Sequence, residues 1–300
     1  MKNRKKCLFV YNPHSGKGKI QEQLAGVIET FTENGYVVTA IPTQKSKEST
    51  KIIAENGQDY DLVVVSGGDG TLTEGISGIT GIPMEQRPGF AYIPAGTTND
   101  VARSLGISRN PNVAAQQIME GHPHRMDVGR LDEIKFTYVA AFGAGTEVTY
   151  NTPQSMKKAL GHSAYVLSTM KSFQNMKKIP VHVEMDDGTV LDEEVLFGMV
   201  SSSKSVGGFQ GITGDDVSMD DGVFELLLVP TLAKSLQEDW ENFRNMTEPA
   251  GDRFLFNVYK VRKVSFDFEE EIEWTIDGEY AGARTDVEIE ALPGFVELIY

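Results

Sequence analysis

The 300-residue sequence has a single cysteine and no long apolar run. Cys7 cannot form an internal disulfide, and its apolar surroundings predict a small buried hydrophobic residue. No segment approaches the roughly 20 apolar residues that cross a bilayer. The apolar run that follows the basic start ends at Tyr11, which is too short for a secretory signal. We therefore expect a cytoplasmic protein.

Positive charge is scarce, with 28 Lys and Arg against 43 Asp and Glu and a formal net charge of −15. This balance argues against nucleic acid as a partner and against broad attraction to anionic membranes. Residues 148–183 reverse it, because they contain lysines but no Asp or Glu. Within this window, apolar residues recur at helical spacing between Ser163 and Lys178. The pattern fits a packed helix and also a peripheral contact with a membrane surface, and both interpretations stay open.

The lysine of a P-loop is also missing from the most glycine-rich segment, residues 66–74. This segment follows a buried-strand pattern at residues 62–65 and precedes a helical pattern, for which Thr71 and Thr73 are candidate caps. Glycines at such a junction leave backbone N–H groups open to a phosphate. Asp69 would then hold a phosphate-bound Mg²⁺ or order nearby donors. An ordinary glycine-rich turn is the alternative.

Two further polar loops follow predicted strands at residues 7–11 and 89–94. The first contains Ser15, Gly16 and Lys17, and the second contains a glycine, hydroxyls and the Asn99-Asp100 pair. A strand at 36–41 and a helix at 49–56 complete a β-α alternation, which predicts a parallel sheet with the loops along one edge. Asp100 has a plain alternative role as a helix cap.

Short strands with polar turns dominate after roughly residue 128 and predict a β-sandwich. The fold class is therefore an α/β domain followed by an all-β domain. The expected strands are residues 136–142, 181–185, 195–201, 224–229, 263–268, 273–276, 287–291 and 295–300.

Three motifs together resemble the catalytic domain of diacylglycerol kinases and the related sphingosine and ceramide kinases. They are Asn12-Pro13-x-Ser15-Gly16, Gly67-Gly68-Asp69-Gly70-Thr71, and Pro94-x-Gly96-Thr97-x-Asn99-Asp100-x-Ala102-Arg103. The resemblance continues through 126–129, 207–209, 220–224 and 276–280, and the soluble bacterial branch is the most similar. It implies a Rossmann-like nucleotide domain of the NAD kinase and phosphofructokinase type at residues 1–128, to which 293–300 return. Residues 129–292 would form the β-sandwich domain for the lipid.

The resemblance implies ATP and Mg²⁺ as cofactors and a site for each. The implied nucleotide-binding residues are Asn12, Pro13, Ser15, Gly16, Lys17, Thr43, Gly67, Gly68, Gly70, Thr71, Glu74, Gly96, Thr97, Asn99 and Asp100. Asp69, Asp277 and Glu279 would be catalytic, with the base either Asp277 or Glu279; a plain Asp-Gly hairpin is the alternative for this turn. The metal would be held by Asp221 with main-chain oxygens of Ser218 and Val223, unless these residues form only an acidic surface turn.

The implied reaction transfers the γ-phosphate of ATP to a hydroxyl of diacylglycerol or a similar lipid at a membrane surface, giving phosphatidic acid. An NAD-kinase-like phosphotransferase and a non-catalytic nucleotide-binding regulator are the alternatives. A homodimer is one candidate oligomeric state. Five histidines at irregular spacing indicate no zinc site.

Overall fold

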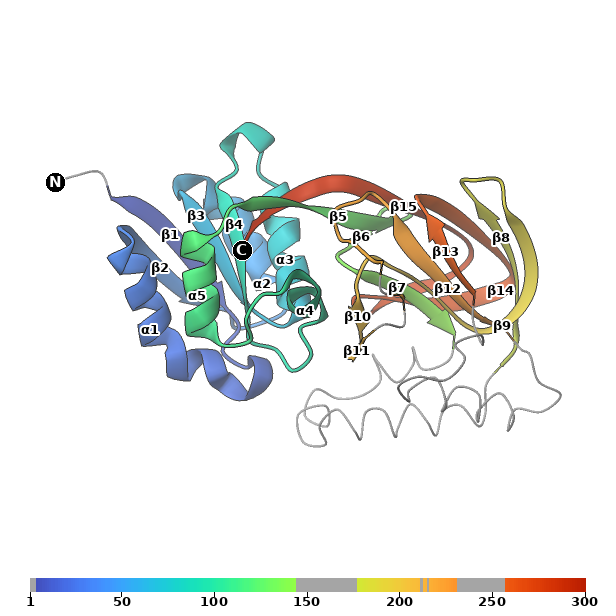
Figure 1. Ribbon diagram of the computed structural model, residues 1–300, viewed down its shortest axis with the longest axis horizontal. Coiled ribbons are helices and arrows are strands. Elements are labelled where there is room, and N and C mark those ends of the chain that lie inside the picture. The colour runs from blue at the N-terminus through green and yellow to red at the C-terminus, as the bar shows by residue number, and fades with distance from the viewer. Residues whose placement is uncertain (1–3, 144–176, 211–212, 215, 231–256) are drawn as a thin grey trace. The chain divides into compact units, whose positions relative to one another are not determined.

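A computed structural model describes residues 4–143, 177–210, 213–214, 216–230 and 257–300. The chain divides into two compact units (Figure 1). The first contains residues 1–128, 204–212 and 293–300, and the second contains residues 129–203 and 213–292. The chain therefore passes between the units four times along its length.

The first unit is built on four neighbouring parallel strands in the order β2-β1-β3-β4. They are β1 (Lys5–Tyr11), β2 (Tyr36–Pro42), β3 (Leu62–Gly67) and β4 (Gly89–Pro94). β3 is buried along its whole length, as expected for an apolar strand covered on both faces of a parallel sheet. β2 is an outer strand, and none of its residues is charged.

Among the described residues of this unit, five α-helices connect or flank the strands. They are α1 (Lys19–Glu33), α2 (Glu48–Asn56), α3 (Asp69–Thr80), α4 (Asp100–Leu105) and α5 (Pro111–Glu120), with short 3₁₀ turns η1 (Ser15–Gly18), η2 (Gly57–Asp59) and η3 (Met84–Gln86). α1 packs against α5, and α2 packs against α3 (Figure 1). The α5 cap follows from sequence, because the Asn110 side chain accepts from the N–H groups of Asn112 and Val113 and Pro111 occupies the first turn.

Two later segments join the first unit. The hairpin of β10 (Ser205–Val206) and β11 (Phe209–Gln210) turns at Gly207 and Gly208, which both have positive φ. The end of β15 (Glu279–Ile299) adds a parallel pairing beside β4, between Ile299 and Ala91. Residues from the end of the chain thus extend the sheet that its first hundred residues begin.

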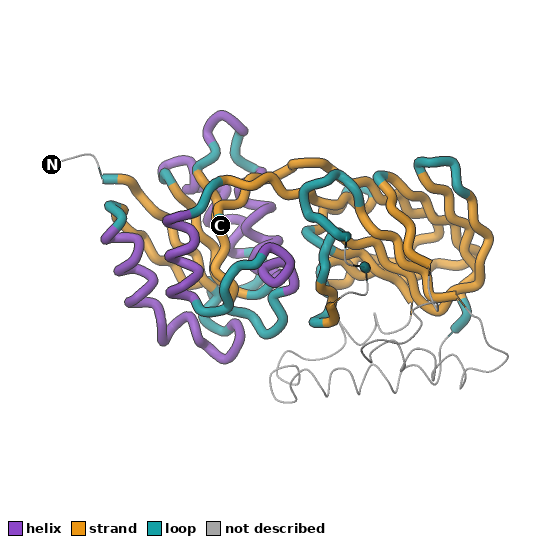
Figure 2. Tube along the Cα trace, viewed as in Figure 1, coloured by secondary structure: helices purple, strands orange, loops and turns teal. Residues whose placement is uncertain are grey.

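The described residues of the second unit are almost entirely in strands (Figure 2). Its main antiparallel order is β13-β12-β9-β7-β14-β15, and β8 pairs with both β9 and β14. Besides β15, its strands are β5 (Pro123–Leu131, shared with the first unit), β6 (Ile134–Phe136), β7 (Val139–Gly143), β8 (Ile179–Met185), β9 (Val190–Ser201), β12 (Phe224–Pro230), β13 (Asn257–Val261) and β14 (Lys263–Ile276). One hydrophobic core draws on nearly all of them and centres on Phe142, Phe266 and Trp274.

The second unit differs from the sequence expectation in how its strands connect. Two expected strands, 263–268 and 273–276, form the single strand β14, whose pairing with β15 shifts register between Asp267 and Ile272. Likewise β15 runs unbroken through the two segments expected at 287–291 and 295–300. The long strands β14 and β15 each pair with several neighbours. The strands expected to form a sandwich are therefore connected by hydrogen bonds within one sheet.

The basic window of the sequence lies mostly outside the described residues. The helix predicted between Ser163 and Lys178 also lies outside them, except for Lys177 and Lys178. Lys177 pairs with Glu270, and Lys178 lies 3.7 Å from a carboxylate oxygen of Glu194. Each of these two lysines therefore has an acidic neighbour within the second unit.

Candidate active site

Three polar loops of the first unit meet at the carboxyl ends of β1, β3 and β4. The Asn12 N–H donates to Ser66 O at 2.8 Å, which ties the first loop to the second. The N–H groups of Ala95 and Gly96 donate to Gly67 O at 2.7 and 3.0 Å, which ties the third loop to the second. The structure therefore brings together the three motifs that the sequence analysis singled out.

Glycines let these loops approach each other closely. A Cβ on Gly16 would lie 2.0 Å from Ala95 O, and one on Gly96 would lie 2.5 Å from Gly68 Cα. Gly70 differs, because a Cβ there would meet nothing within 4 Å. Gly16 and Gly96 are thus required by loop packing, whereas Gly70 leaves open backbone at the start of α3, where an anion is favoured.

Asp69 begins α3 and links it to α4. Its carboxylate accepts the N–H groups of Asp100 at 3.1 Å and Val101 at 3.2 Å, the first two residues of α4. α3 therefore begins two residues before Thr71, with Gly68 as its N-cap, and the expected threonine caps are wrong. Two roles were expected for Asp69, holding a phosphate-bound Mg²⁺ and ordering nearby donors. These two hydrogen bonds support the second role.

Asp100 is buried and holds the hairpin of β10 and β11. Its Oδ1 accepts from Ser205 Oγ at 2.5 Å and from Gly208 N–H at 3.0 Å. Arg103 donates to Gly208 O at 3.0 Å from the same helix. Burial raises the pKa of the Asp100 carboxyl, and the bonds from Ser205 and Gly208 oppose that rise. The Gly207-Gly208 motif is thus anchored to α4 by two side chains.

Asn99 closes the third loop from inside, in a left-handed conformation with φ of 54°. Its Oδ1 accepts from Gly96 N–H at 2.9 Å, and its Nδ2 donates to Gly96 O at 3.0 Å. The buried Tyr92 hydroxyl lies 3.0 Å from Gly67 O, and burial raises the pKa of Tyr92 well above its ordinary value. Sequence reasoning missed Tyr92, which a strand pattern does not distinguish from any other core aromatic residue.

The remaining nucleotide candidates occupy varied positions. Thr43 N–H donates to Tyr11 O at 2.9 Å and so stands directly beside the end of β1. The Glu74 carboxylate accepts the N–H groups of Lys47 at 2.7 Å and Ser49 at 3.3 Å, at the start of α2. Thr97 is exposed, and the Lys17 side chain lies outside the described residues. Glu74 is thus engaged with backbone, while Thr97 faces solvent.

Asp277 and Glu279 belong to the second unit. Asp277 forms the two-residue turn between β14 and β15 with Gly278, and Glu279 is the first residue of β15. The Asp277 carboxylate accepts backbone N–H groups from residues 137, 138 and 139 at 2.7, 3.0 and 3.3 Å. Asp277 has φ of +48°, as an Asp-Gly hairpin requires. The Glu279 side chain is exposed and makes no hydrogen bond or ion pair with the described residues. The two carboxylates therefore have opposite surroundings.

The expected metal residues lie in the loop that leads into β12. Asp221 accepts the N–H of Val223 at 3.0 Å, and the Ser218 hydroxyl bonds to Asp220. Among the described residues, no three His, Cys, Asp or Glu side chains are grouped to hold a metal. A cation here would need main-chain oxygens and water beside Asp221, which suits a hard divalent ion.

Asp127 has a clear role in the first unit. Its carboxylate accepts the N–H of Gly294 at 2.7 Å and so helps to hold the returning end of the chain. This hydrogen bond lies within the first unit, which in the sequence ends next to Asp127, at residue 128.

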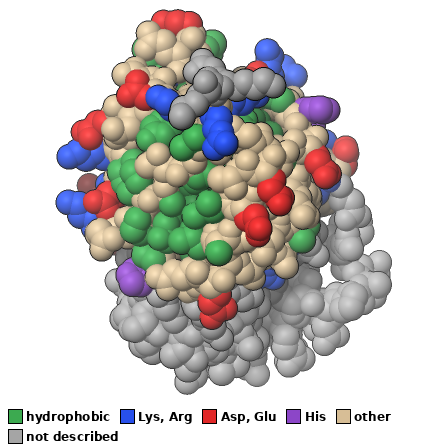
Figure 3. Space-filling model, turned by 90° about the vertical axis from the view of Figure 1, so that its left-hand side faces the viewer, with side chains coloured by type: hydrophobic (Ala, Val, Ile, Leu, Met, Phe, Trp, Pro, Cys, Tyr) green, Lys and Arg blue, Asp and Glu red, His purple; other side chains and the backbone are tan. Residues whose placement is uncertain are grey.

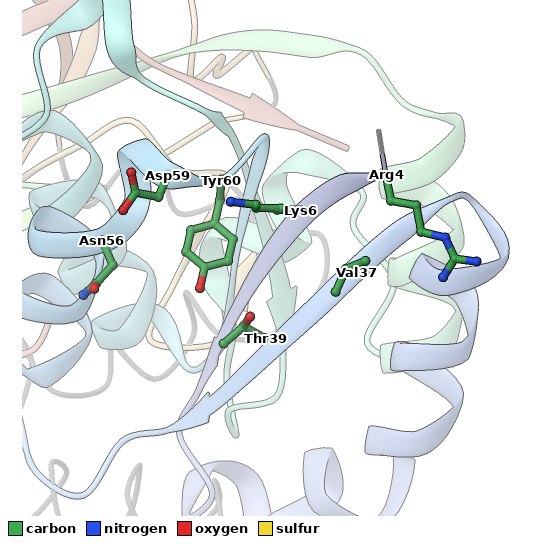
Figure 4. A pocket seen from close by; sticks show the side chains of 7 residues that line it. All are labelled: Arg4, Lys6, Val37, Thr39, Asn56, Asp59 and Tyr60. Atoms are coloured by element: carbon green, nitrogen blue, oxygen red, sulfur yellow. The ribbon is translucent and has the colours of Figure 1, made fainter. Parts of the chain in front are cut away.

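A pocket of about 440 Å³ opens on the first unit away from the three loops. Figure 4 shows it between the amino-terminal part of the sheet, with Lys6 and Val37, and the segment with Asn56 and Tyr60. Hydrophobic side chains gather on the face of this unit shown in Figure 3. Because the polar loops follow the carboxyl ends of the strands, this pocket is separate from the candidate site.

No α-helix in the described ranges combines the length and the apolar character needed to span a bilayer.

Loops of this kind, with glycine backbone at a helix start beside parallel strands, are typical of enzymes that bind phosphate groups of nucleotides. Residues 6–131 match the family model of the diacylglycerol kinase catalytic domain. The diacylglycerol kinase of Bacillus subtilis is 32% identical over 282 residues, with 93% of this chain and 91% of the relative covered. The one from Staphylococcus carnosus is 32% identical over 288 residues, with 93% and 90% covered.

Solved structures agree with these relatives. A crystal structure of a diacylglycerol kinase from Bacillus anthracis has a TM-score of 0.76 at 25% identity, covering all of this chain and 98% of the other. Another structure from the same organism reaches 0.81 at 29% identity, covering 100% and 96%. The chain belongs to the diacylglycerol kinase family, and it is therefore an enzyme, a lipid kinase, as the sequence motifs predicted.

Proposed function

We propose that this lipid kinase transfers the γ-phosphoryl group of ATP to the free hydroxyl of diacylglycerol, giving phosphatidic acid and ADP. The observation that carries the proposal is the open backbone at Gly70 beside the start of α3, in a chain of this family. A phosphate placed there would face the positive end of the helix and uncrowded peptide groups.

The residues of the three loops fit a bound nucleotide in three ways. Gly68 and Gly70 leave space next to the helix start, where a Cβ would meet only Gly96 Cα at 3.6 Å or nothing within 4 Å. Asp69 and Asn99 bind loop backbone and so hold these glycines in position. Thr97 is exposed and free to approach a nucleotide with its hydroxyl. In this proposal the loops supply positioning, which is the main requirement of phosphoryl transfer.

Mg²⁺ would neutralise charge on the phosphates as the new bond forms. The chain's own contribution at the acceptor is Glu279, whose exposed carboxylate is free to take the proton of the lipid hydroxyl. The hydroxyl oxygen bonds to the γ-phosphorus, the bond from that phosphorus to the bridging oxygen breaks, and ADP leaves. Asp277 holds the turn in place through its three backbone bonds.

A structural Mg²⁺ at Asp221, with main-chain oxygens of Ser218 and Val223, is part of the proposal. The oxygen-only donor set fits a hard ion. Chelation would be tested by measuring the melting temperature with and without EDTA.

We propose a peripheral contact with membranes for delivery of the lipid. Lys171, Lys177 and Lys178 provide the positive charge, although two of them have acidic neighbours. Changing all three to Gln should weaken sedimentation with anionic vesicles and lower turnover on vesicle lipid more than on a short-chain soluble analogue. An equal fall on both substrates would argue against the contact. A homodimer stays a prediction, and analytical ultracentrifugation would test it by measuring the mass of the protein in solution.

An assay with labelled ATP and Mg²⁺ tests the reaction across diacylglycerol, monoacylglycerol, phosphatidylglycerol and a sphingoid base in mixed micelles, with NAD as the control acceptor. Label in phosphatidic acid alone is the expected result. Label in another lipid would mean that this lipid is the acceptor, and label in NAD would favour an NAD-kinase-like enzyme. Nucleotide binding without transfer to any acceptor would favour a non-catalytic regulator.

A further inference from the structure

Glu225 on β12 is a buried carboxylate without a hydrogen-bond partner in the described structure. Only 1% of the residue is exposed, and neither carboxylate oxygen makes a hydrogen bond with the described residues. Burying an unpaired charge is costly, so such a group is expected to have a counter-charge or to be neutralised. Both carboxylate oxygens of Glu225 nevertheless lack a described hydrogen-bond donor.

The position of Glu225 on its strand explains this isolation. Phe224, Leu226 and Leu228 enter the hydrophobic core of the second unit, so Glu225 points to the opposite face of the sheet. The loop that contains Val217 and Met219 precedes the strand, and both side chains are buried. The carboxylate is thus shielded from water without entering the core.

The two residues opposite Glu225 on the neighbouring strands bond to other groups. Lys260 lies opposite Glu225 on β13, but its Nζ bonds to Asp216, 3.1 Å from Oδ2 and 3.2 Å from the main-chain oxygen. Ser201 lies opposite on β9, and its hydroxyl donates to Tyr138 O at 2.8 Å. Lys260 is thus a nearby positive charge, but its ion pair is with Asp216, and it makes no hydrogen bond to Glu225. One lysine therefore stands among three carboxylates, those of Asp216, Asp221 and Glu225, and this excess of acidic groups favours a divalent ion.

We propose that the buried carboxylate of Glu225 is a ligand of a divalent-cation site under the 216–221 loop. Together with Asp221 it would bind one Mg²⁺, either directly or through a bound water. This inference rests on the proposed function only in taking Asp221 as a metal ligand. The ion would supply the charge that Glu225 lacks, and Glu225 would supply an anionic oxygen donor of the kind that a hard ion prefers. Binding of the ion would thereby stabilise the 216–221 loop over the sheet.

The test uses full-length protein freed of metal and without nucleotide or lipid. Magnesium binding is followed by isothermal titration calorimetry and by the rise in melting temperature on adding Mg²⁺. Glu225→Gln should lower the affinity about tenfold or more and reduce the Mg²⁺-dependent rise. In EDTA the same variant should melt above the wild type, because it avoids the cost of burying a carboxylate that has no hydrogen-bond partner. A residue that only fills the core would alter the melting temperature in EDTA and leave the Mg²⁺-dependent rise unchanged.

Two variants make the outcome specific. Glu269→Gln, at an exposed glutamate of β14, should leave both measurements unchanged. Asp221→Asn should also weaken Mg²⁺ binding, as Glu225→Gln does. Loss in Asp221→Asn alone would overturn the role of Glu225 and keep the metal site of the proposed function. Loss in neither variant, or in Glu225→Gln alone, would overturn the shared site, whereas the kinase reaction is judged separately by transfer of label to lipid.

Discussion

Two carboxylates in one short turn have different surroundings, and this difference predicts different effects of mutation. Glu279→Gln should reduce kcat by about 10² to 10⁴, because a neutral amide cannot accept the hydroxyl proton. The unfolding free energy should stay unchanged, since the side chain has no described partner. Rates of lipid phosphorylation and urea unfolding would measure the two quantities.

Asp277→Asn is the matched control at the other position of the turn. It weakens hydrogen bonds to residues 137–139 and should lower stability by about 1–3 kcal/mol. If Asp277→Asn abolished turnover in a fully stable protein while Glu279→Gln remained active, the base would be Asp277.

The sequence could indicate this turn but not distinguish its two acids. An Asp-Gly pair between apolar strands is a local signal for a hairpin. The partners of Asp277 lie about 140 positions earlier in the chain, at 137–139. Spacing along the sequence carries no information on such distant backbone groups, so both carboxylates stayed candidates. Glu225 was overlooked for the same reason, because its isolation depends on where Lys260 points.

At the scale of elements, the start of α4 depends on the side chain of Asp69, the first residue of α3. Asp69→Ala would remove the acceptor for the first two N–H groups of α4 and should cost about 0.5–2 kcal/mol of stability, as for the loss of a helix cap. Phosphoryl transfer should fall far more, because the loop positions change relative to the bound phosphates. Circular dichroism would confirm that the protein is folded. A folded variant with activity within tenfold of wild type would remove this loop from catalysis.

The pairing of β8 with β9 should depend on pH through His182. Its ring nitrogens lie 2.7 Å from Asp192 Oδ1 and 3.3 Å from Glu184 Oε1, and these bonds raise its pKa. A base with a raised pKa in the folded state contributes stability that is complete below about pH 6.5, the unfolded value, and is lost as pH rises through the folded value.

His182→Gln should therefore lower the melting temperature more at pH 5.5 than at pH 8.5. Thermal unfolding at the two values measures this difference. An equal effect at both would mean that the charge of His182 does not contribute.

Local patterns predicted most elements of the first unit and fewer of the second. Apolar runs and glycines marked β1, β3 and the loops after them, since burial on both faces leaves a continuous signal. In β14, residues 269–271 are three exposed glutamates, so its alternation breaks and the sequence suggests two strands. Pairing with β15 continues on both sides of the shift in register, which only the neighbouring strand determines.

At the scale of the whole chain, the first unit depends on the last eight residues. Val296 and Leu298 are 4% and 0% exposed, and Ile299 pairs with Ala91 of β4. Deleting residues 293–300 removes these contacts, and each buried side chain is worth about 1.5–3 kcal/mol. The truncated protein should melt well below the wild type, and the amides of β4 should exchange faster with solvent.

Leu298→Ala provides a milder version of this change, expected to cost about 2–5 kcal/mol. A truncated protein with the melting temperature of the wild type would mean that β4 is stable as an edge strand.

The return of β15 to β4 has a consequence for synthesis on the ribosome. Domains near the start of a chain usually fold while later residues are still being made. Here the strand that completes the first sheet is translated only after the residues of the second unit, and Asp127 cannot bind Gly294 until then. We expect β4 to stay an open edge through most of translation, when nascent chains on neighbouring ribosomes could pair with it. Pauses after β4 and before residues 293–300 should therefore promote aggregation of this protein more than pauses before β4 is made.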